Sequence, residues 1–159
     1  VVSCRQGAPG LPEAAACRLG GMLFDVLDYL HRRGIVHRDI SLDNVLVAVD
    51  KLDLRLIDFN CARLPLDEGE LALTPTGTPV CAAPEVVAGD SPSESSDVWG
   101  AGLCVFYMMS GRLPQRRGEP GASIQRRRLE AAAARPEALT GSCWRDVDEA
   151  IKALLGECL

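Results

Sequence analysis

The chain has 159 residues, and its 47% hydrophobic content is enough for one domain with a buried core. Its 22 acidic and 17 basic residues give a net charge of −5, so no overall basic field attracts nucleic acid or an acidic membrane surface. No apolar run approaches the roughly 20 residues that a membrane span needs. We therefore expect neither nucleic acid nor a membrane among its partners.

Cysteine usage indicates a reducing compartment. The seven cysteines are odd in number, scattered, and without a Cys-x-x-Cys pair. Reduced thiols in the cytoplasm or nucleus fit this pattern, and we expect most of them to fill the core. Neither His31 nor His37 has the spacing of a zinc ligand. The N-terminus has no secretion signal and begins at Val1, which indicates a fragment of a longer protein.

The first predicted element is a helix over residues 11–34. Apolar residues recur in it at three- and four-residue steps and give one stripe. Pro12 and Glu13 suit its first turn, and Gly34 supplies the stop. His31, at the end of this helix, is expected on the surface.

A loop over 35–44 follows, and then a β-hairpin over 45–57. The residues of 45–47 and 52–57 are β-branched or Leu-rich, and Asp50-Lys51 between them is typical of a turn. Residues 58–85 continue mostly as a loop, because 61–82 is rich in Pro and has little periodicity. Such a long loop is itself an indication of function.

The second strong helix is predicted over residues 93–111. Ser95 or Ser96 caps it, and Gly111 with Pro114 ends it. Its middle, 98–109, is apolar on every side, which predicts a buried helix. Two further helices are expected within 122–159, over 122–135 and 147–159. The pattern as a whole predicts a mainly α fold with a short β-hairpin.

Three short motifs stand in order along this framework. His37-Arg38-Asp39 is followed five residues later by Asn44, then come Asp58-Phe59-Asn60 and Ala83-Pro84-Glu85. Their order and spacing resemble the catalytic half of a eukaryotic-type protein kinase. The resemblance covers nearly the whole chain. It implies the large C-terminal lobe of the α+β kinase-like fold, with the N-terminal lobe absent, because no Gly-rich loop or strand Lys precedes.

The resemblance implies the chemistry of the site. The reaction would be transfer of the γ-phosphate of ATP to protein Ser/Thr hydroxyls, with Asp39 as the base. Asn44 and Asp58 stand at the positions of the Mg²⁺ ligands and offer the hard oxygens that this ion requires. Leu46 would form the apolar floor under the adenine. Ser41 stands where many relatives have the Lys that reaches the transferred phosphate.

Other residues take supporting roles in the resemblance. Arg38 would receive a phosphorylated Thr of the 58–85 segment, which resembles an activation segment. Thr78, in Gly77-Thr78-Pro79, would help position the catalytic Asp, and it favours Ser/Thr over Tyr as acceptor. Asp97 would hold the backbone of the 37–38 turn, and Glu85 would pair with an Arg beyond the end of this chain. The residues with structural roles are His37, Phe59, Glu85 and Asp97.

Two departures keep an alternative open. Ser41 cannot supply the positive charge of the usual Lys, and Asn60 replaces a Gly, although Asn tolerates the left-handed backbone region. The alternative is a pseudokinase, a scaffold or binding module without phosphotransfer. A small-molecule phosphotransferase of kinase-like fold is a third and weaker reading. The implied partners are a protein substrate and the missing N-terminal lobe, without which this fragment alone is expected to be inactive.

Overall fold

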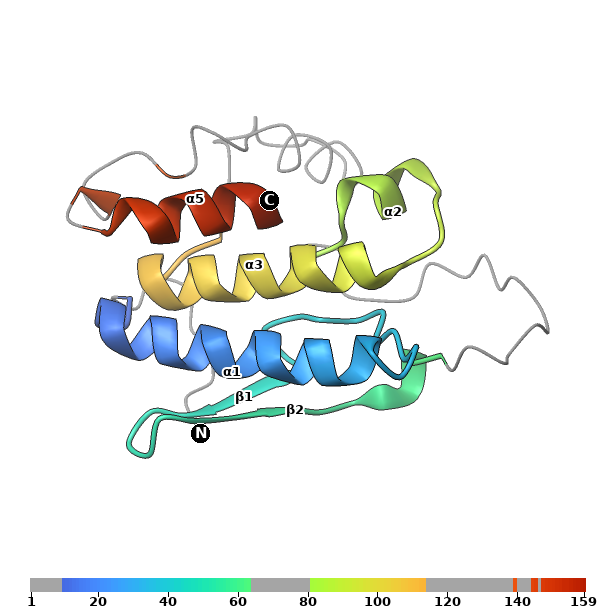
Figure 1. Ribbon diagram of the computed structural model, residues 1–159, viewed down its shortest axis with the longest axis horizontal. Coiled ribbons are helices and arrows are strands. Elements are labelled where there is room, and N and C mark those ends of the chain that lie inside the picture. The colour runs from blue at the N-terminus through green and yellow to red at the C-terminus, as the bar shows by residue number, and fades with distance from the viewer. Residues whose placement is uncertain (1–9, 64–80, 114–138, 140–143, 146) are drawn as a thin grey trace, which may run out of the picture.

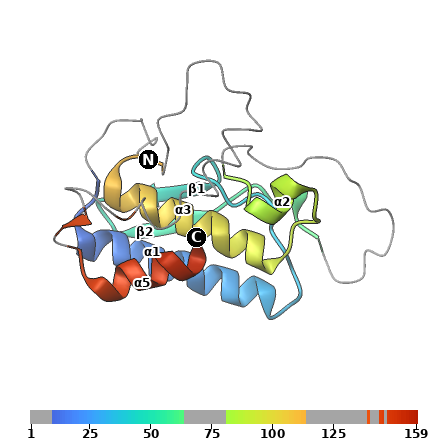
Figure 2. The same cartoon turned by 90° about the horizontal axis from the view of Figure 1, so that it is seen from above.

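The structure, a computed structural model, describes residues 10–63, 81–113, 139, 144, 145 and 147–159. In Figure 1 the helix α5 lies on α3, α3 lies on α1, and the β-hairpin lies on the far side of α1. Figure 2 shows the same layers from above, with α2 beside one end of α3. The described part is mainly helical with one two-stranded sheet, which confirms the predicted class. In chain order the elements are α1 (Glu13–His31), β1 (Val45–Ala48), β2 (Asp53–Leu56), the 3-10 helix η1 (Phe59–Cys61), α2 (Pro84–Ala88), α3 (Glu94–Ser110) and α5 (Glu149–Cys158).

The helix α1 turns a single apolar stripe toward α3. Leu19, Leu23 and Leu27 are at most 2% exposed, and their four-residue spacing puts them on one face. The helix ends at His31, and Gly34 then takes a φ of 69°, a left-handed conformation that suits Gly. This turn redirects the chain from α1 into the 35–44 loop. The position of the loop is thereby tied to the packed end of α1.

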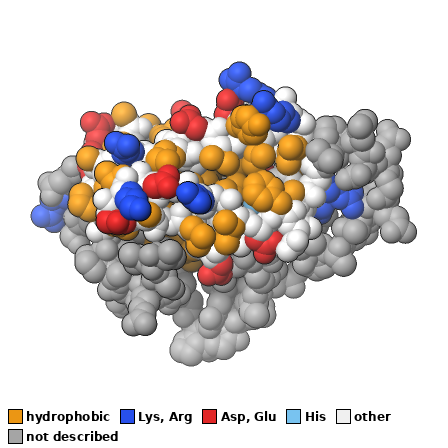
Figure 3. Space-filling view, turned by 90° about the horizontal axis from the view of Figure 1, so that it is seen from below, with side chains coloured by type: hydrophobic (Ala, Val, Ile, Leu, Met, Phe, Trp, Pro, Cys, Tyr) orange, Lys and Arg blue, Asp and Glu red, His pale blue; other side chains and the backbone are white. Residues whose placement is uncertain are grey.

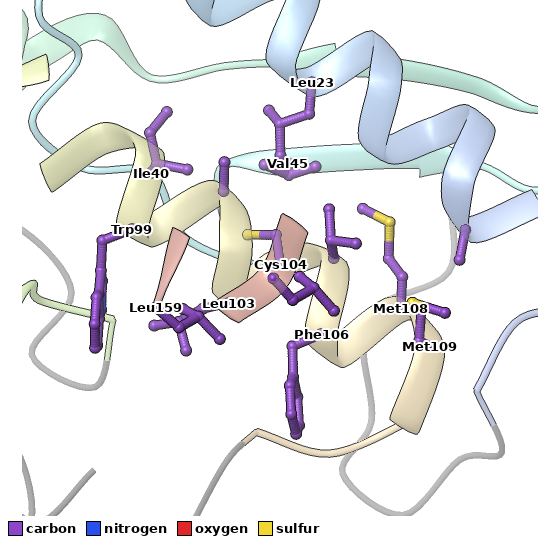
Figure 4. Packing of buried hydrophobic residues seen from close by; sticks show 14 of the residues in the cluster. Leu23, Ile40, Val45, Trp99, Leu103, Cys104, Phe106, Met108, Met109 and Leu159 are labelled. Carbon is purple, nitrogen blue, oxygen red and sulfur yellow. The ribbon is translucent and has the colours of Figure 1, made fainter. Parts of the chain in front are cut away.

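The helix α3 is the centre of the core. Every residue from Trp99 to Met109 is buried, so it has no solvent-facing side over this length. Figure 4 shows Ile40 and Val45 on one side of α3 and Phe106 and Leu159 on the other. The packing of α3 on both sides lets it act as the rigid support for the loops around it.

The start of α3 corrects the sequence-based expectation. The N-cap is Ser93, with extended backbone, and neither Ser95 nor Ser96 takes that place. Ser96 contributes from the third helical position, where its Oγ accepts the N–H of Ser93 at 2.9 Å. The side chain of Ser93 in turn accepts the main-chain N–H of Ser96. This reciprocal pattern is a capping box, and it fixes the first turn that carries Asp97.

The hairpin pairs Val45 with Leu56 and Val47 with Leu54 in antiparallel register. Side chains alternate across a strand, so these four residues share one face, and Val45 and Leu54 on it are buried. Leu46 lies opposite Arg55 on the other face. The two strands thus separate a core face from a face that carries Leu46.

The helix α5 packs against α3 near the chain's C-terminus. Its N-cap Asp148 accepts the N–H of Ala150 at 2.7 Å, and Leu155 is fully buried. The approach is close, because a Cβ on Gly102 would come within 2.8 Å of the Cβ of Cys158. None of the helices in the described part of the chain is long and apolar enough to cross a membrane. The helix expected over 122–135 lies outside the described residues.

The cysteines occupy more varied places than expected. Cys81 and Cys104 are buried, whereas Cys61 and Cys158 are half-buried and Cys17 is exposed. Cys81 and Cys104 belong to the core cluster and Cys158 packs against it, so the expectation that most cysteines fill the core holds among the described residues, with Cys17 and Cys61 as exceptions. Cys17 lies on the outer side of α1, where solvent access costs a small apolar side chain little.

Candidate active site

Asp39 and Asn44 are joined directly in the 35–44 loop. The Nδ2 atom of Asn44 donates to the main-chain oxygen of Asp39 and to its Oδ2, both at 2.9 Å. Asn44 is 7% exposed, and its own N–H donates to the main-chain oxygen of Ser41 at 3.1 Å. The amide therefore holds the carboxylate of Asp39 in one orientation. It also leaves Oδ1 of Asn44 as the amide atom for another partner.

His37 ties this loop to the strand end that precedes Asp58. Its Nε2 lies 3.1 Å from the main-chain oxygen of Ile57, and its Nδ1 accepts the N–H of Asp39 at a long 3.4 Å. A carbonyl only accepts, so Nε2 carries the proton. The ring of His37 also meets the ring of Phe59 edge to face, with centroids 4.7 Å apart. His37 is fully buried, in keeping with a packing role.

Asp58 lies beside the loop and faces solvent. The N–H of Ile57, its neighbour in sequence, donates to the main-chain oxygen of Asn44 at 2.9 Å, which ties the two segments together. The side chain of Asp58 is exposed, and Oδ1 accepts the N–H of Asn60 at 3.2 Å. Among the described residues, the side chain of Asp58 makes its hydrogen bond to Asn60 and none to the side chains of Asp39 and Asn44. The structure brings the three side chains to neighbouring segments, and it joins two of them.

Backbone strain falls on Asp58 and Arg38. Their φ angles are 62° and 69°, in the left-handed region that most residues avoid. Asn60 lies in the short helix η1 and has no positive φ, so the left-handed tolerance expected to matter there is not used. A strained non-Gly residue costs on the order of 1–3 kcal/mol and persists only where its surroundings hold it. Arg38 is held in this way by Asp97.

Asp97, in the first turn of α3, is 1% exposed. Its Oδ2 accepts the N–H of His37 at 2.8 Å, and its Oδ1 accepts the N–H of Arg38 at 2.9 Å. The Nε2 of His31 lies 3.0 Å from the same Oδ2. The side chain of His31 is only 14% exposed, so the expectation that it lies on the surface is wrong. It turns inward because a buried carboxylate needs donors that water no longer supplies.

Ser41, expected among the cofactor-binding residues, lies in the interior of the protein. It is fully buried, and its Oγ has no hydrogen-bond partner in the described part of the chain. The hydroxyl is enclosed in the protein, and the place of Ser41 among the cofactor-binding residues stays a prediction. The loop turns Ser41 inward because its main-chain oxygen closes the turn to Asn44. Leu46 remains half-buried on the outer face of the hairpin.

The Ala83-Pro84-Glu85 segment closes one side of the site. A pocket between the loop, this segment and the start of α3 has Asp39 and Cys81 in its wall. Burial raises the pKa of the Cys81 thiol to about 11, although a hydrogen bond from the backbone of Leu42 opposes the shift. Glu85 is half-buried in the first turn of α2. Thr78 lies outside the described residues.

The open side of the site is partly apolar. Ile57 is 37% exposed and Phe59 is 45% exposed, on either side of Asp58. Figure 3, which views the hairpin side of the molecule, shows apolar side chains gathered among charged ones. The site therefore combines an exposed carboxylate with exposed apolar surface, as an interface for a ligand or another segment requires.

The donor atoms suit Mg²⁺ bound together with phosphates. The described residues contain no cluster of three or more His, Cys, Asp or Glu side chains able to hold a metal. Mg²⁺ in phosphotransfer sites is bound by one or two protein groups plus substrate phosphates and waters, so a small donor set fits. Oδ1 of Asn44 and the exposed carboxylate of Asp58 are the hard oxygens available for it.

The structure adds two residues that the sequence pattern did not indicate. His31 contacts Asp97 across 66 positions of sequence, and Cys81 meets the loop beside Asp39. Neither contact can be predicted from a local sequence pattern, because each depends on how segments far apart in the sequence pack together.

Helical layers, hairpin and loop together define a protein kinase domain. The chain belongs to the protein kinase domain family, whose model matches residues 4–159. It is 38% identical over 107 residues to serine/threonine-protein kinase KIN4 of Saccharomyces cerevisiae and 42% identical over 108 residues to CBL-interacting protein kinase 4 of Oryza sativa subsp. japonica. It is also 38% identical over 104 residues to protein kinase C zeta type of Oryctolagus cuniculus.

The similarity covers part of each protein. The aligned region is 65% of this chain in all three cases. It is 13% of the yeast kinase, 23% of the rice kinase and 17% of the rabbit kinase. The aligned region thus spans less than a quarter of the length of these relatives.

Proposed function

We propose that the native protein is a protein kinase that transfers the γ-phosphate of ATP to Ser or Thr hydroxyls of protein substrates. The observation that carries this proposal is the pair of 2.9 Å hydrogen bonds from Asn44 to Asp39. They hold a carboxylate in a fixed orientation beside an exposed second carboxylate, Asp58. Phosphoryl transfer relies mainly on positioning and on charge stabilisation, and this arrangement supports both.

Asp39 is the proposed base. It would orient the acceptor hydroxyl and take its proton, an assistance typically worth about 10²–10⁴-fold. Asn44 and Asp58 would hold Mg²⁺, which when bound neutralises charge on the phosphates. Leu46, on the outer face of the hairpin, would support the adenine. Arg38 would receive a phosphate on the 58–85 segment, and Thr78 would help orient Asp39.

The lobe assignment is part of the same proposal. The described helices and hairpin would form the large C-terminal lobe, and the exposed Ile57 and Phe59 would face the smaller N-terminal lobe. Glu85 would pair with an Arg outside this chain. The cysteines among the described residues are free, which would fit the cytoplasm or nucleus. By itself, this chain would leave half of the ATP site open to water.

The test compares two aspartates of one loop in the native protein. We expect Asp39→Asn to lower kcat for phosphorylation of casein by at least about 100-fold, because the base is lost. Asp43→Asn is the matched control, since Asp43 is exposed in the same loop, and it should change kcat by no more than about twofold. Equal activity of Asp39→Asn and wild type would show that Asp39 is not the base.

Ser41 favours a second candidate, the pseudokinase. The usual cationic Lys is replaced by a hydroxyl, and that hydroxyl is fully buried. A loss of charge stabilisation at developing negative charge is typically worth about 10²–10³ in rate. Thermal shift with Mg-ATP separates the candidates when it is combined with the casein assay. Phosphorylation that Asp39→Asn abolishes supports the kinase, and no phosphorylation by wild type supports the scaffold.

A further inference from the structure

The carboxylate of Asp97 is shared among three donors. Two of them are the main-chain N–H groups of His37 and Arg38, which lead directly into Asp39. The third is the imidazole of His31, whose Nε2 lies 3.0 Å from the Oδ2 that also accepts the N–H of His37. Both oxygens of this carboxylate are therefore engaged. The helix end, the loop and α3 meet at one buried group.

The direction of the His31 contact follows from the chemistry of its partner. The two oxygens of Asp97 already accept backbone N–H groups, and a carboxylate acts only as an acceptor. The Nε2 of His31 must therefore carry a proton and donate it. Among the described residues, His31 is the side chain that lies within hydrogen-bond distance of the carboxylate of Asp97. A donor is valuable there, since Asp97 is 1% exposed and water cannot replace it.

The contact bears on the strained turn before Asp39. Arg38 keeps its φ of 69° while its N–H is bound to Asp97, so the orientation of that carboxylate sets the turn. His31 approaches from the last turn of α1 and contacts the same Oδ2 that accepts the N–H of His37. With His31 removed, the carboxylate has one contact fewer to define its rotamer. The two N–H bonds then weaken together.

The geometry points to His31 as a positioning residue of the catalytic loop, acting through Asp97 on the turn that presents Asp39. It does not touch the reacting atoms. The effect on phosphotransfer rests on the function proposed above, whereas the effect on the loop does not. The two can therefore be tested separately.

The first experiment measures amide hydrogen exchange in the native protein, without an activity assay. His31→Phe keeps an aromatic ring but removes the donor, so we expect the amides of His37 and Arg38 to exchange about tenfold faster. His31→Gln places an amide nitrogen at the same distance along the side chain, and it should restore exchange to within about threefold of wild type. Arg32→Gln is the matched control, because Arg32 is exposed on the same helix turn.

The second experiment separates positioning from a general loss of structure. We expect His31→Phe to lower kcat for casein phosphorylation about tenfold, with KM for Mg-ATP changed less than about twofold, and His31→Gln to recover most of kcat. Arg32→Gln should match wild type in both constants. A rise in KM with unchanged kcat, or no recovery with Gln, would contradict a positioning role.

The outcomes test the positioning role of His31 and the proposed kinase function separately. Unchanged exchange at His37 and Arg38 in a folded His31→Phe variant overturns the role of His31. If that variant does not fold, the ¹⁵N spectrum of wild-type imidazoles decides instead, because an unprotonated Nε2 on His31 overturns the role equally. Absence of phosphotransfer by wild type refutes the proposed kinase function, and the exchange experiment still decides whether His31 positions the loop.

Discussion

The aspartates around the site differ chiefly in where their charge is satisfied. Asp97 is buried and relies on protein donors, whereas Asp58 and Asp43 are exposed and keep water as a partner. A buried carboxylate without donors is costly, so its contribution to stability depends on those bonds. An exposed carboxylate is free to meet a cation or a substrate. Position in the fold therefore separates the structural aspartate from those able to bind.

Asp97→Asn tests the structural role. An amide has one acceptor oxygen where the carboxylate has two, so at least one of the N–H groups of His37 and Arg38 loses its partner. Hydrogen bonds to charged groups contribute about 1.5–3 kcal/mol each, and we expect the free energy of unfolding to fall by about 2–4 kcal/mol in urea titrations. Asp28→Asn, on the exposed face of α1, should cost less than about 1 kcal/mol. Similar losses for the two variants would contradict this account.

Cys81 makes a prediction about pH. Burial, the largest influence, raises the pKa of its thiol from 9.0 to about 11, and the charges of Asp39 and Asp43 act in the same direction. Below about pH 9 the folded and unfolded states both keep the proton. Between about pH 9 and 11 only the unfolded state loses it, so the free energy of unfolding falls by up to about 2–3 kcal/mol as pH rises.

The measurement compares urea titrations of wild type and Cys81→Ala near pH 8 and near about pH 10.5. Cys17 and Cys158 also have raised pKa values and titrate in both proteins, so the difference between the two proteins isolates Cys81. Wild type should lose more stability than Cys81→Ala over this range. Parallel pH dependence in the two proteins would show that the Cys81 thiol is not held protonated by the fold.

At the scale of elements, α3 supports the loop by backbone contact. A Cβ on Gly100 would lie 2.6 Å from the main-chain oxygen of Ile40 and 2.8 Å from its Cβ. These distances are shorter than atoms tolerate, and the atom closest to the new Cβ belongs to the backbone. The residue after Asp39 therefore rests directly on the helix. Gly100 is required here because it lacks a side chain, since its own φ is not left-handed.

Gly100→Ala and Gly21→Ala form a matched pair. The methyl group of Gly100→Ala must displace Ile40 from α3. We therefore expect this substitution to lower the free energy of unfolding by about 1–3 kcal/mol. Gly21 lies in α1, and a Cβ added there would have nothing within 4 Å, so Ala at this position should stabilise by about 0.5–1 kcal/mol. Thermal and urea unfolding of both variants measure the difference. A neutral Gly100→Ala would show that loop and helix are less tightly packed than described.

The sequence pattern predicted the elements better than their contacts. The stripe of α1 and the all-apolar middle of α3 are local patterns that burial enforces, so both helices were foreseeable. The cap of α3 was misplaced because Ser93, Ser95 and Ser96 all suit the role, and only the extended backbone at Ser93 distinguishes them. Such a choice depends on how the preceding segment arrives, which the local sequence does not record.

Contacts between distant segments were the harder part of the site. The family resemblance indicated the partners of Asp97 in the loop, but nothing around His31 indicated that it would reach the same carboxylate. The burial of Ser41 was likewise hidden, because Ser is compatible with both surface and core. Spacing along the chain fixes which residues belong to one loop. The direction of each side chain is decided by packing against α1 and α3.

For the whole molecule, the layered arrangement predicts an order of local stability. Between α1 and α5, α3 has buried residues on all sides, while α2 has none. Amides that open only with the whole core exchange slowest, and those of weakly buried elements exchange through local opening. We expect amide exchange to be slowest in the middle of α3 and in the buried stripe of α1. Exchange in α2 should be faster by at least about tenfold.

Hydrogen exchange with mass spectrometry on the native protein measures this order, and Leu23→Ala provides the internal comparison. Leu23 is fully buried between α1 and α3, so its truncation should cost about 2–5 kcal/mol and accelerate exchange in both helices together. Met22→Ala, one position away and only half-buried, should have a smaller effect. If Leu23→Ala accelerated amide exchange in α1 without accelerating it in α3, the two helices would not unfold as one unit. The rigid support inferred for the catalytic loop would then be limited to α3 and its direct contact with Ile40.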